Sequence, residues 1–380
     1  MTTAVCLGAG MVGRLLAADL ARERGVRVVA LDRSASSLER ARALAGRMGV
    51  EVETGEADLS DPAAIARAIE DADVVCGALA SHLGFAALEA VCRAGKAYVD
   101  ISFMEEDALE HDALAKERGA RAVVDMGVAP GMSNLLAGEV ARELSPCRRL
   151  RIFVGGLPKE RRWPFEYKAG FAPADVIEEY TRPARLVEHG EVVVREALSE
   201  PEPIDFPGVG TLEAFNTDGL RSLATTLDVP DMAEKTLRYP GHIDLMRAMR
   251  ETGLFSRTPI EVGGQRVVPL EVTSALLFPK WTYEEGEIDL TVMRVFGEAR
   301  GRRVQWDLYD EADLSIGASS MARTTALPAA IVARMLLDGT IGAPGVHAPE
   351  ALAGNVLVVE RLISELGDRG VRYERREETL

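Results

Sequence analysis

The glycine-rich turn GAGMVG, from Gly8 to Gly13, constrains the fold of this chain more than any other feature. It follows the apolar run Ala4–Leu7 and opens an apolar helix, and a second apolar run, Val26–Leu31, ends at Asp32. This order of strand, glycine turn, helix, strand and acid is typical of domains that bind a dinucleotide. We therefore expect an α/β fold that begins with a Rossmann unit of a doubly wound parallel sheet.

Each residue of this turn has a distinct expected role. Gly8 makes the tight turn, Gly10 lets the backbone approach a pyrophosphate, and Gly13 lets the helix pack closely on the strand. Met11 and Val12 lie at the start of the helix, where free N–H groups and the helix dipole favour phosphate. The alternative is a chance glycine turn in an α/β protein, which the complete strand–turn–helix–strand context disfavours.

The residues at the end of the second strand bear on the choice of cofactor. Asp32 is expected to accept hydrogen bonds from the adenosine ribose, and its carboxylate repels a 2′-phosphate. The sequence therefore favours NAD over NADP. Arg33 and Ser34 follow directly and offer groups that suit a phosphate, although Arg33 is equally consistent with a solvated arginine at a helix start.

Composition limits the class of partner. The 380 residues carry a formal net charge of −16 with a pI near 5.0, which disfavours nucleic acid and anionic membranes as partners. No apolar stretch approaches the roughly 18 residues of a membrane span. The chain enters a strand at once, so we expect no signal peptide. The four cysteines form no CxxC pair and no metal spacing, which predicts a cytoplasmic protein without a metal site.

The chain divides into two kinds of pattern. Strands and helices alternate through the first third, as in a parallel sheet. Hairpins follow, at Arg185–Val194 and at Ile288–Glu311, with helical stretches at Asp218–Thr226 and His242–Thr252, which favours an inserted α+β domain with a mixed or antiparallel sheet. We predict a dinucleotide-binding domain at 1–126, a substrate and dimerisation domain at 127–318, and C-terminal helices at 319–380 that return to the first domain.

Polar residues follow the strands of the first domain, at the edge where ligands bind in doubly wound sheets. Asp58 is expected near the adenine, and Leu79, Ala80 and Ser102 near the cofactor riboses. Three further residues, Glu105, Asp125 and Asn134, are candidates for binding substrate or moving a proton. Capping is the alternative role for Asp58, and a satisfied strand-end carboxylate is the alternative for Asp125.

The second domain contains two polar blocks beside glycine and proline turns. In the first, Thr217 or Asp218 caps a helix, and Arg221 lies one turn in, where its guanidinium suits a bidentate carboxylate. The second runs from Glu234 to His242 and alternates like a strand, with Lys235 on one face and Arg238 on the other. Taken alone, each of these residues is more often structural than functional.

A third block places aromatic residues among charges. It comprises Trp163–Lys168, which includes Tyr167, and Tyr180–Arg182. Such a composition suits a ligand wall, for which Tyr167 is the candidate, or a seam between two subunits. The sequence does not separate these two interpretations.

These blocks together resemble the saccharopine dehydrogenase-like family. The resemblance spans nearly the whole chain in order, and the versions DGLRSL and EKTLRYPGH are most similar to those of bacterial lysine 6-dehydrogenases. It implies NAD-dependent oxidation of the ε-amine of L-lysine to allysine with release of ammonia, after which allysine cyclises to piperideine-6-carboxylate, and a homodimer. The motifs that carry it are GAGMVG, VDISFMEED, DMGVAPGMSN, EYTRPA, LEAFNTDGLRSL, EKTLRYPGH and SMARTTALPAA.

That reaction assigns expected roles to the candidates. The ε-amine has a pKa near 10.4, so a base must remove a proton before hydride can leave the adjacent carbon. His242 is the leading base and Lys235 the second. Arg221 or Arg238 would hold the α-carboxylate, and Asp218 or Glu105 an ammonium group. Two alternatives remain: imine reduction of the carboxynorspermidine or saccharopine type, and a dinucleotide-sensing protein without turnover.

Overall fold

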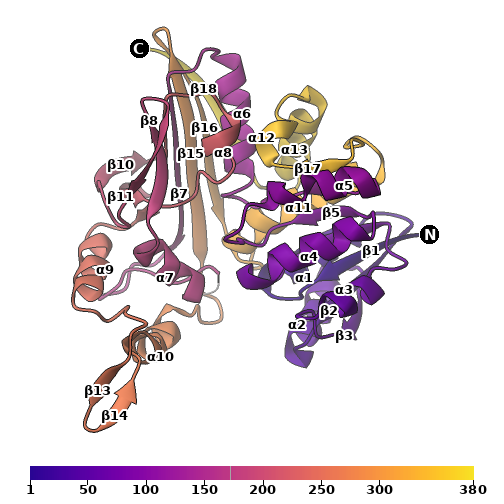
Figure 1. The fold of residues 1–380 in the computed structure, drawn as a ribbon, viewed down its shortest axis with the longest axis horizontal. Coiled ribbons are helices and arrows are strands. Elements are labelled where there is room, and N and C mark those ends of the chain that lie inside the picture. Colours follow the sequence, from indigo (N-terminus) through magenta and orange to yellow (C-terminus); the bar gives the residue numbers. More distant parts are fainter. Residues whose placement is uncertain (172) are drawn as a thin grey trace. The chain divides into compact units, whose positions relative to one another are not determined.

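The computed structural model describes residues 1–171 and 173–380, and its contacts divide the chain into two compact units (Figure 1). Unit 1 comprises Met1–Glu143, Ser315–Ala318 and Ala322–Tyr373. Unit 2 comprises Leu144–Leu314, Ser319–Met321 and Glu374–Leu380. The second unit is therefore inserted in the first, and the first boundary lies after Glu143, rather than after residue 126 as the sequence predicted. The segment 127–143 stays with unit 1 because its helix packs there, with Gly138 lying against Glu350 and Ala353.

A seven-stranded parallel sheet forms the centre of unit 1. The strand order is β17-β6-β5-β4-β1-β2-β3, and it reverses direction at β1, as in a doubly wound fold. This confirms the predicted Rossmann sheet. The strands are β1 Thr2–Leu7, β2 Val26–Asp32, β3 Glu53–Glu56, β4 Val74–Gly77, β5 Ala97–Asp100, β6 Arg121–Val123 and β17 Gly345–His347.

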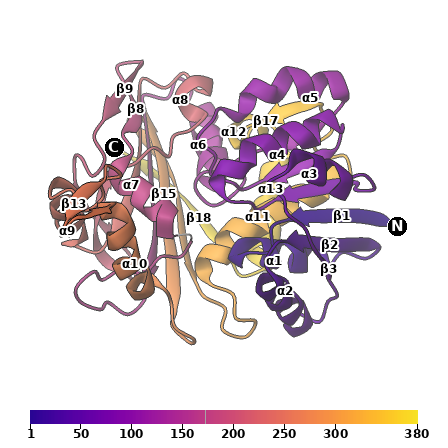
Figure 2. The ribbon, with the colours of Figure 1, turned by 60° about the horizontal axis from the view of Figure 1, so that its bottom comes forward.

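Helices cover both faces of this sheet, with α1 and α2 on one side and α3, α4 and α5 on the other (Figure 2). Ser34 caps α2 by accepting a hydrogen bond from the Ser37 N–H, and Asp61 caps α3 in the same way. The helices are α1 Met11–Leu20, α2 Ala35–Arg47, α3 Pro62–Ala68, α4 Ser81–Arg93, the 3₁₀ helix η1 Ala108–His111, α5 Asp112–Arg118, α6 Met132–Glu143, α11 Ser320–Leu337, α12 Pro349–Leu352 and α13 Val356–Asp368.

A buried ion cluster joins α1 to the C-terminal helices of unit 1. The Asp19 side chain is fully buried, and its carboxylate lies 2.8 Å from Arg334 Nη1 and 2.9 Å from Arg369 Nε. These two guanidinium groups hold the pKa of Asp19 below its usual value, against the opposing effect of burial. The C-terminal segment therefore fixes the helix that follows the glycine turn, as the predicted return to the first domain requires.

Unit 2 is built on a nine-stranded mixed sheet. Its main path is β10-β11-β12-β7-β15-β16-β18, and β8 joins β9 to β12. β12 and β7 run parallel, whereas the neighbouring pairs β11–β12 and β7–β15 run antiparallel. The strands are β7 Arg149–Pro158, β8 Ala184–Glu188, β9 Glu191–Arg195, β10 Glu202–Phe206, β11 Gly210–Asn216, β12 Asp231–Arg238, β15 Asp289–Ala299, β16 Arg302–Glu311 and β18 Tyr373–Thr379.

An aromatic core lies between this sheet and the helices of unit 2. Tyr180, Phe215 and Trp281 are fully buried in it, together with Met246 and Phe255. The helices are α7 Pro173–Thr181, α8 Leu223–Thr226, α9 His242–Glu251 and α10 Pro269–Trp281. A separate two-stranded ribbon, β13 Ile260–Val262 and β14 Gln265–Val267, precedes α10.

Several local predictions were wrong. The charged run at 372–380 predicts a frayed end, but β18 extends the sheet of unit 2. The predicted helix over 218–226 is only the short α8, because the residues before it form a turn. Ser133, which its residue type makes a candidate helix cap, lies inside α6, because that helix begins at Met132. The sequence pattern predicts a weak third strand at Val50–Glu53, and the strand lies at Glu53–Glu56. None of the helices in the described residues is long and apolar enough to cross a membrane.

Candidate active site

The glycine turn of unit 1 has room for a ligand at one position only. A Cβ on Gly8 would lie 2.3 Å from the Ala78 carbonyl oxygen, and one on Gly13 would lie 2.1 Å from the Gly8 carbonyl oxygen. A Cβ on Gly10 would meet no heavy atom within 4 Å, and Gly10 has an ordinary φ of −64°. Gly8 and Gly13 are therefore required by packing, whereas Gly10 borders open space just before Met11 and Val12 of α1. This geometry fits a pyrophosphate at the helix N-terminus.

The carboxylate of Asp32 fixes this turn to the end of β2. Its two oxygens accept hydrogen bonds of 2.8 Å from the backbone N–H groups of Ala9 and Ser34. The Gly8 N–H also donates to the Leu31 carbonyl oxygen at 2.8 Å. Asp32 thus supports the loop, and each of its oxygens keeps lone-pair capacity for a ribose hydroxyl.

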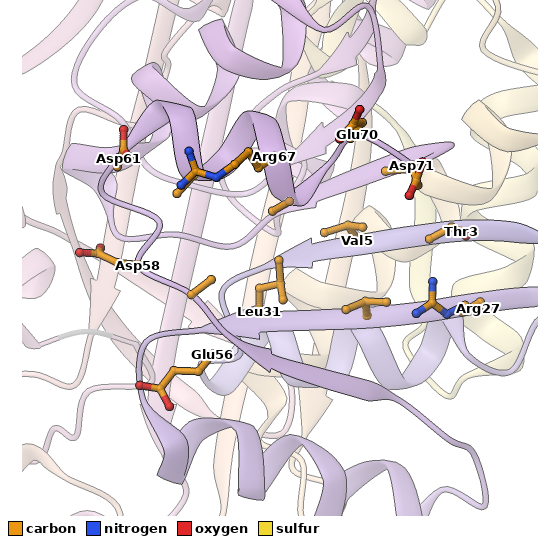
Figure 3. Close-up of a pocket in the computed structure, with 15 residues that line it drawn as sticks. Thr3, Val5, Arg27, Leu31, Glu56, Asp58, Asp61, Arg67, Glu70 and Asp71 are labelled. Carbon is orange, nitrogen blue, oxygen red and sulfur yellow. The ribbon is translucent and has the colours of Figure 1, made fainter.

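A groove of about 710 Å³ lies between β1, β2 and α3 and extends toward the predicted adenosine end (Figure 3). Val5 and Leu31 form its apolar floor, and Glu56 and Asp58 lie at the end near the carboxyl ends of the strands. Asp58 is exposed and accepts hydrogen bonds from the backbone and side chain of Ser60. These carboxylates make that end of the groove a poor place for an additional phosphate.

A buried carboxyl lies at the carboxyl end of β5. Asp100 is fully buried and accepts hydrogen bonds from the Tyr98 hydroxyl at 2.9 Å and from the Ser102 hydroxyl at 2.6 Å. Burial, reinforced by the negative charge of Asp125, raises the pKa of Asp100 to about 7. A Cβ on Gly77 would lie 2.0 Å from the Tyr98 hydroxyl, so this strand position requires glycine. The sequence patterns assigned no role to Asp100.

The other predicted site residues of unit 1 also come after the carboxyl ends of strands in the parallel sheet. Asp125 is buried and has a φ of 52°, in the left-handed region that a non-glycine residue rarely adopts. Asn134 is fully buried in α6, where its side-chain oxygen accepts from the Ser133 hydroxyl. Ala80 precedes α4 directly after Leu79. Glu105 is exposed.

Arg238 is the centre of a buried network in unit 2. Its guanidinium pairs with Glu179, donates to the Tyr180 hydroxyl at 3.2 Å and lies 4.3 Å from the centroid of the Tyr167 ring. A further N–H donates to the Leu237 carbonyl oxygen at 2.9 Å. Because protein groups occupy donors on all three of its nitrogens, this geometry argues against Arg238 as the clamp for a substrate carboxylate.

His242 begins α9 inside the same cluster. Its Nδ1 lies 2.8 Å from the Phe165 carbonyl oxygen and its Nε2 2.9 Å from the Tyr180 hydroxyl. Burial first, and then the charge of Arg238, lower the pKa of His242 to about 3. A neutral imidazole with both nitrogens engaged positions Tyr180, and this arrangement argues against the predicted role as general base.

Lys235 lies on the opposite face of β12 from Glu234 and Arg238. Its ammonium group lies 2.6 Å from a Glu202 carboxylate oxygen and 2.8 Å from the Glu200 carbonyl oxygen. The sequence placed Lys235 and Arg238 on different faces, as the alternation of a strand requires. Because a carboxylate and a backbone carbonyl oxygen already bind this amine, the geometry argues against the predicted role of Lys235 as a base.

The Thr217–Arg221 turn is anchored to a buried acid that sequence reasoning missed. The Thr217 hydroxyl donates to Glu234 at 2.5 Å, and a Cβ on Gly219 would lie 2.3 Å from the Glu234 carboxyl carbon. Burial raises the pKa of Glu234 to about 8. Asp218 pairs with Arg185 at 2.8 Å, which disfavours its predicted contact with a substrate ammonium. A signal existed: Glu234, Thr236 and Arg238 alternate along one face of an interior strand.

Arg221 lies at the end of this anchored turn. It precedes α8 instead of lying one turn inside a helix, as the sequence had indicated. It is largely buried, and its φ is 52°, a conformation that costs a non-glycine residue on the order of 1 kcal/mol. Such backbone strain is concentrated at functional positions, which supports a role for the Arg221 side chain.

The aromatic block 163–168 divides between core and surface. Tyr167 is buried against Trp281 and His242, with ring centroids 5.5 Å and 5.1 Å apart. Trp163 has 87% of its surface exposed. No group of three or more metal-ligating side chains occurs within residues 1–171 and 173–380.

Fold and site together define a nicotinamide-dinucleotide-dependent oxidoreductase. Residues 4–123 match the "Saccharopine dehydrogenase NADP binding domain" and residues 127–371 the "Saccharopine dehydrogenase C-terminal domain". These matches show that the chain belongs to the saccharopine dehydrogenase family, whose members act on amino-acid and amine substrates.

Named relatives are similar at low identity. The bovine mitochondrial alpha-aminoadipic semialdehyde synthase is 24% identical over 72% of this chain, which spans only 37% of that protein. The saccharopine dehydrogenase [NADP(+), L-glutamate-forming] of Schizosaccharomyces pombe is 20% identical, with 83% of this chain and 87% of that protein covered. The solved apo saccharopine dehydrogenase of Saccharomyces cerevisiae superposes with a TM-score of 0.81 at 19% identity over all of both chains, which confirms the fold.

The open space at Gly10 generates a prediction. Gly10→Ala should fold with unchanged or slightly higher stability, because its added methyl group meets nothing within the protein. The same methyl group should weaken dinucleotide binding at least about tenfold by obstructing the pyrophosphate. Calorimetric titration with NAD and thermal unfolding measure the two effects. Gly13→Ala is the contrasting variant and should lose stability, and equal NAD affinity in Gly10→Ala would refute the assignment.

The two buried acids generate a second prediction. Because the pKa values of Asp100 and Glu234 are raised to about 7 and about 8, both carboxyls should carry a proton at about pH 6 and lose it as the pH rises. Infrared difference spectra should show two carboxylic-acid carbonyl bands disappearing in that order. Asp100→Asn should remove the first band and Glu234→Gln the second. The assignment fails if both bands are absent from the native protein at about pH 6.

Proposed function

We propose that this protein catalyses the NAD-dependent oxidative deamination of the ε-amine of L-lysine to allysine, with release of ammonia. The product would then cyclise to piperideine-6-carboxylate. Family membership supports an amine or amino-acid substrate, and the DGLRSL and EKTLRYPGH motifs support lysine among the substrates of the family.

The observation that favours lysine over saccharopine is that three cations of unit 2 are paired with acids. Arg185, Lys235 and Arg238 are each already paired with an acid of the same unit. Saccharopine carries three carboxylates, whereas lysine carries one. A unit in which these three cations are neutralised internally suits the substrate with the single carboxylate, for which Arg221 is the proposed partner.

The adenosine end of unit 1 supports NAD over NADP. The carboxylates of Asp32, Glu56 and Asp58 would oppose a 2′-phosphate there, and the nearby cation Arg33 is close enough to Asp58 to lower its pKa. The name of the matching family domain refers to NADP, so the preference of this chain between NAD and NADP has to be measured. When bound, the cofactor supplies the acceptor for the hydride that leaves the carbon beside the amine.

The chain must remove a proton from the substrate ammonium before that hydride can leave. We assign this proton to the Asp100 and Asp125 pair in place of His242, because a carboxyl with a pKa near neutrality accepts a proton more readily than an imidazole with a pKa of about 3. Asp125 would face the ammonium and pass the proton to Asp100, whose pKa is raised by burial and by the charge of Asp125. The hydrogen bonds that Tyr98 and Ser102 donate to Asp100 favour its charged form and so favour release of the proton afterwards.

The deciding experiment is a substrate panel with NAD and NADP run side by side. Purified protein with L-lysine and NAD should reduce the coenzyme and release one ammonia per turnover. A matched control, 6-hydroxynorleucine, keeps the carboxylate and lacks the ε-amine, and it should give no ammonia. The lysine proposal fails if coenzyme reduction requires saccharopine.

The principal alternative is reductive imine formation. Relatives named saccharopine dehydrogenase and, in Synechocystis, carboxyaminopropylagmatine dehydrogenase favour it. Such an enzyme oxidises reduced coenzyme when an amine and a carbonyl compound are supplied together, and it gives nothing with lysine alone. A dinucleotide-sensing protein would bind the coenzyme and turn over no amine.

Because the backbone at Arg221 is strained, a substitution there can distinguish a substrate-binding role of its side chain from a structural one. Arg221→Gly relieves the positive φ, which should offset part of the stability that is lost with the buried side chain. It should also raise the KM for lysine on the order of 100-fold through loss of the carboxylate contact, with NAD affinity unchanged. Steady-state kinetics and thermal unfolding provide the readouts. Unchanged lysine kinetics in a stable Arg221→Gly protein would exclude the clamp role.

A further inference from the structure

The buried side chain of Glu234 lies against the turn that carries Arg221. Glu234 is 3% exposed and belongs to β12, an interior strand of the mixed sheet of unit 2. A Cβ on Gly219 would lie 2.3 Å from the Glu234 carboxyl carbon and 2.4 Å from one of its oxygens. The backbone of the turn therefore packs directly on this carboxyl group, and a side chain at position 219 would push the two apart.

Two groups of the turn donate hydrogen bonds to the carboxyl of Glu234. The Thr217 hydroxyl donates to it at 2.5 Å, and the Gly219 backbone N–H donates to it as well. The Thr217 N–H also donates to the Glu234 carbonyl oxygen at 3.3 Å, and the Thr217 hydroxyl lies 2.9 Å from that of Thr236. Glu234 thus holds the start and the middle of the turn through both its backbone and its side chain.

The other side of the turn is held by Arg185 of β8. The Asp218 carboxylate accepts hydrogen bonds of 2.8 Å and 2.9 Å from the Arg185 guanidinium group. Leu220 is fully buried, and the turn then ends at Arg221 with its positive φ of 52°. A strained backbone conformation persists only where the surrounding structure over-determines it. The contacts on both sides of the turn, with Glu234 on the buried side, supply that constraint.

We propose that Glu234 is a positioning residue for the substrate carboxylate: it holds the Thr217–Arg221 turn in the conformation that presents the Arg221 side chain. This inference rests on the proposed function, because Arg221 is the partner of the carboxylate only in that proposal. Glu234 acts through the turn and not by contact with the substrate.

The charge of Glu234 determines how well it can hold the turn. Burial, reinforced by the negative charges of Glu179 on α7 and Asp218 in the turn, raises its pKa to about 8 against the effect of its hydrogen bonds. The cations Arg238 and Arg185 pair with these two acids. An ionised carboxyl at this buried position has acidic neighbours, so ionisation favours an open turn that admits water. Binding of a substrate carboxylate should therefore weaken above about pH 8.

The test measures the binding of hexanoate to full-length protein saturated with NAD, by calorimetric titration. Hexanoate has a carboxylate and no amine, so its own charge is constant between about pH 7 and about pH 9.5. Native protein should bind it at least about tenfold more weakly at about pH 9.5 than at about pH 7. Glu234→Gln keeps the shape and an acceptor oxygen but cannot ionise, so its affinity should equal the native value at about pH 7 and stay constant.

Two substitutions of Thr217 test the anchor itself at about pH 7. Thr217→Val keeps the shape and loses the hydroxyl, so hexanoate affinity should fall on the order of tenfold, whereas Thr217→Ser keeps the hydroxyl and should bind as the native protein does. Glu298→Gln is the matched control, because Glu298 is a partly buried acid of the interior strand β15 that pairs with Arg303, and it should keep the native pH dependence. Thermal unfolding and NAD titration establish that each variant is folded.

Arg221→Gly distinguishes failure of this inference from failure of the proposed function. If native protein does not bind hexanoate, or if Arg221→Gly binds it with native affinity, the carboxylate role of Arg221 fails and this inference fails with it. If Arg221→Gly loses hexanoate binding while Glu234→Gln keeps the native pH dependence, the proposed function stands and the role of Glu234 is overturned. Native affinity in Thr217→Val overturns that role in the same way, and this variant decides the question if Glu234→Gln does not fold.

Discussion

Backbone contact at the glycine turn is the constraint on which the rest of unit 1 depends. Gly13 lies against the Gly8 carbonyl oxygen and Gly8 against Ala78, so β1, α1 and the end of β4 can approach only without side chains at those positions. Asp32 then ties the turn to β2, and Asp19 ties α1 to the C-terminal helices through Arg334. The open space at Gly10 is a result of this packing, and it is where the phosphates of a dinucleotide fit.

Unit 2 uses its charged side chains mainly on one another. Arg238 is satisfied by Glu179 and Tyr180, Lys235 by Glu202, and Asp218 by Arg185. Buried charges require such partners, because an unpaired charge in the interior costs several kcal/mol. The polar motifs therefore fix the shape of the unit, and Arg221 is one of several non-glycine residues of this unit whose positive φ lowers local stability.

Local signals predicted most of the fold. The glycine turn and the hairpin between β15 and β16 both depend on residues close together in the sequence. The predictions that were wrong concern residues whose partners are far away in the sequence. Arg238 and Glu179 are separated by 59 residues, so the sequence could not show that the arginine was already paired. Its charged alternation made β18 appear to be a solvated tail, because an edge strand needs few apolar residues.

The positions of the three tryptophans have a spectroscopic consequence. Trp163, Trp281 and Trp306 all belong to unit 2, and the sequence segments of unit 1 contain no tryptophan. Trp281 is fully enclosed in the aromatic core, whereas Trp163 is open to solvent. Indole emission during denaturation therefore reports the loss of the second unit alone. Comparing it with far-ultraviolet dichroism, which samples both units, reveals whether they melt together or in succession.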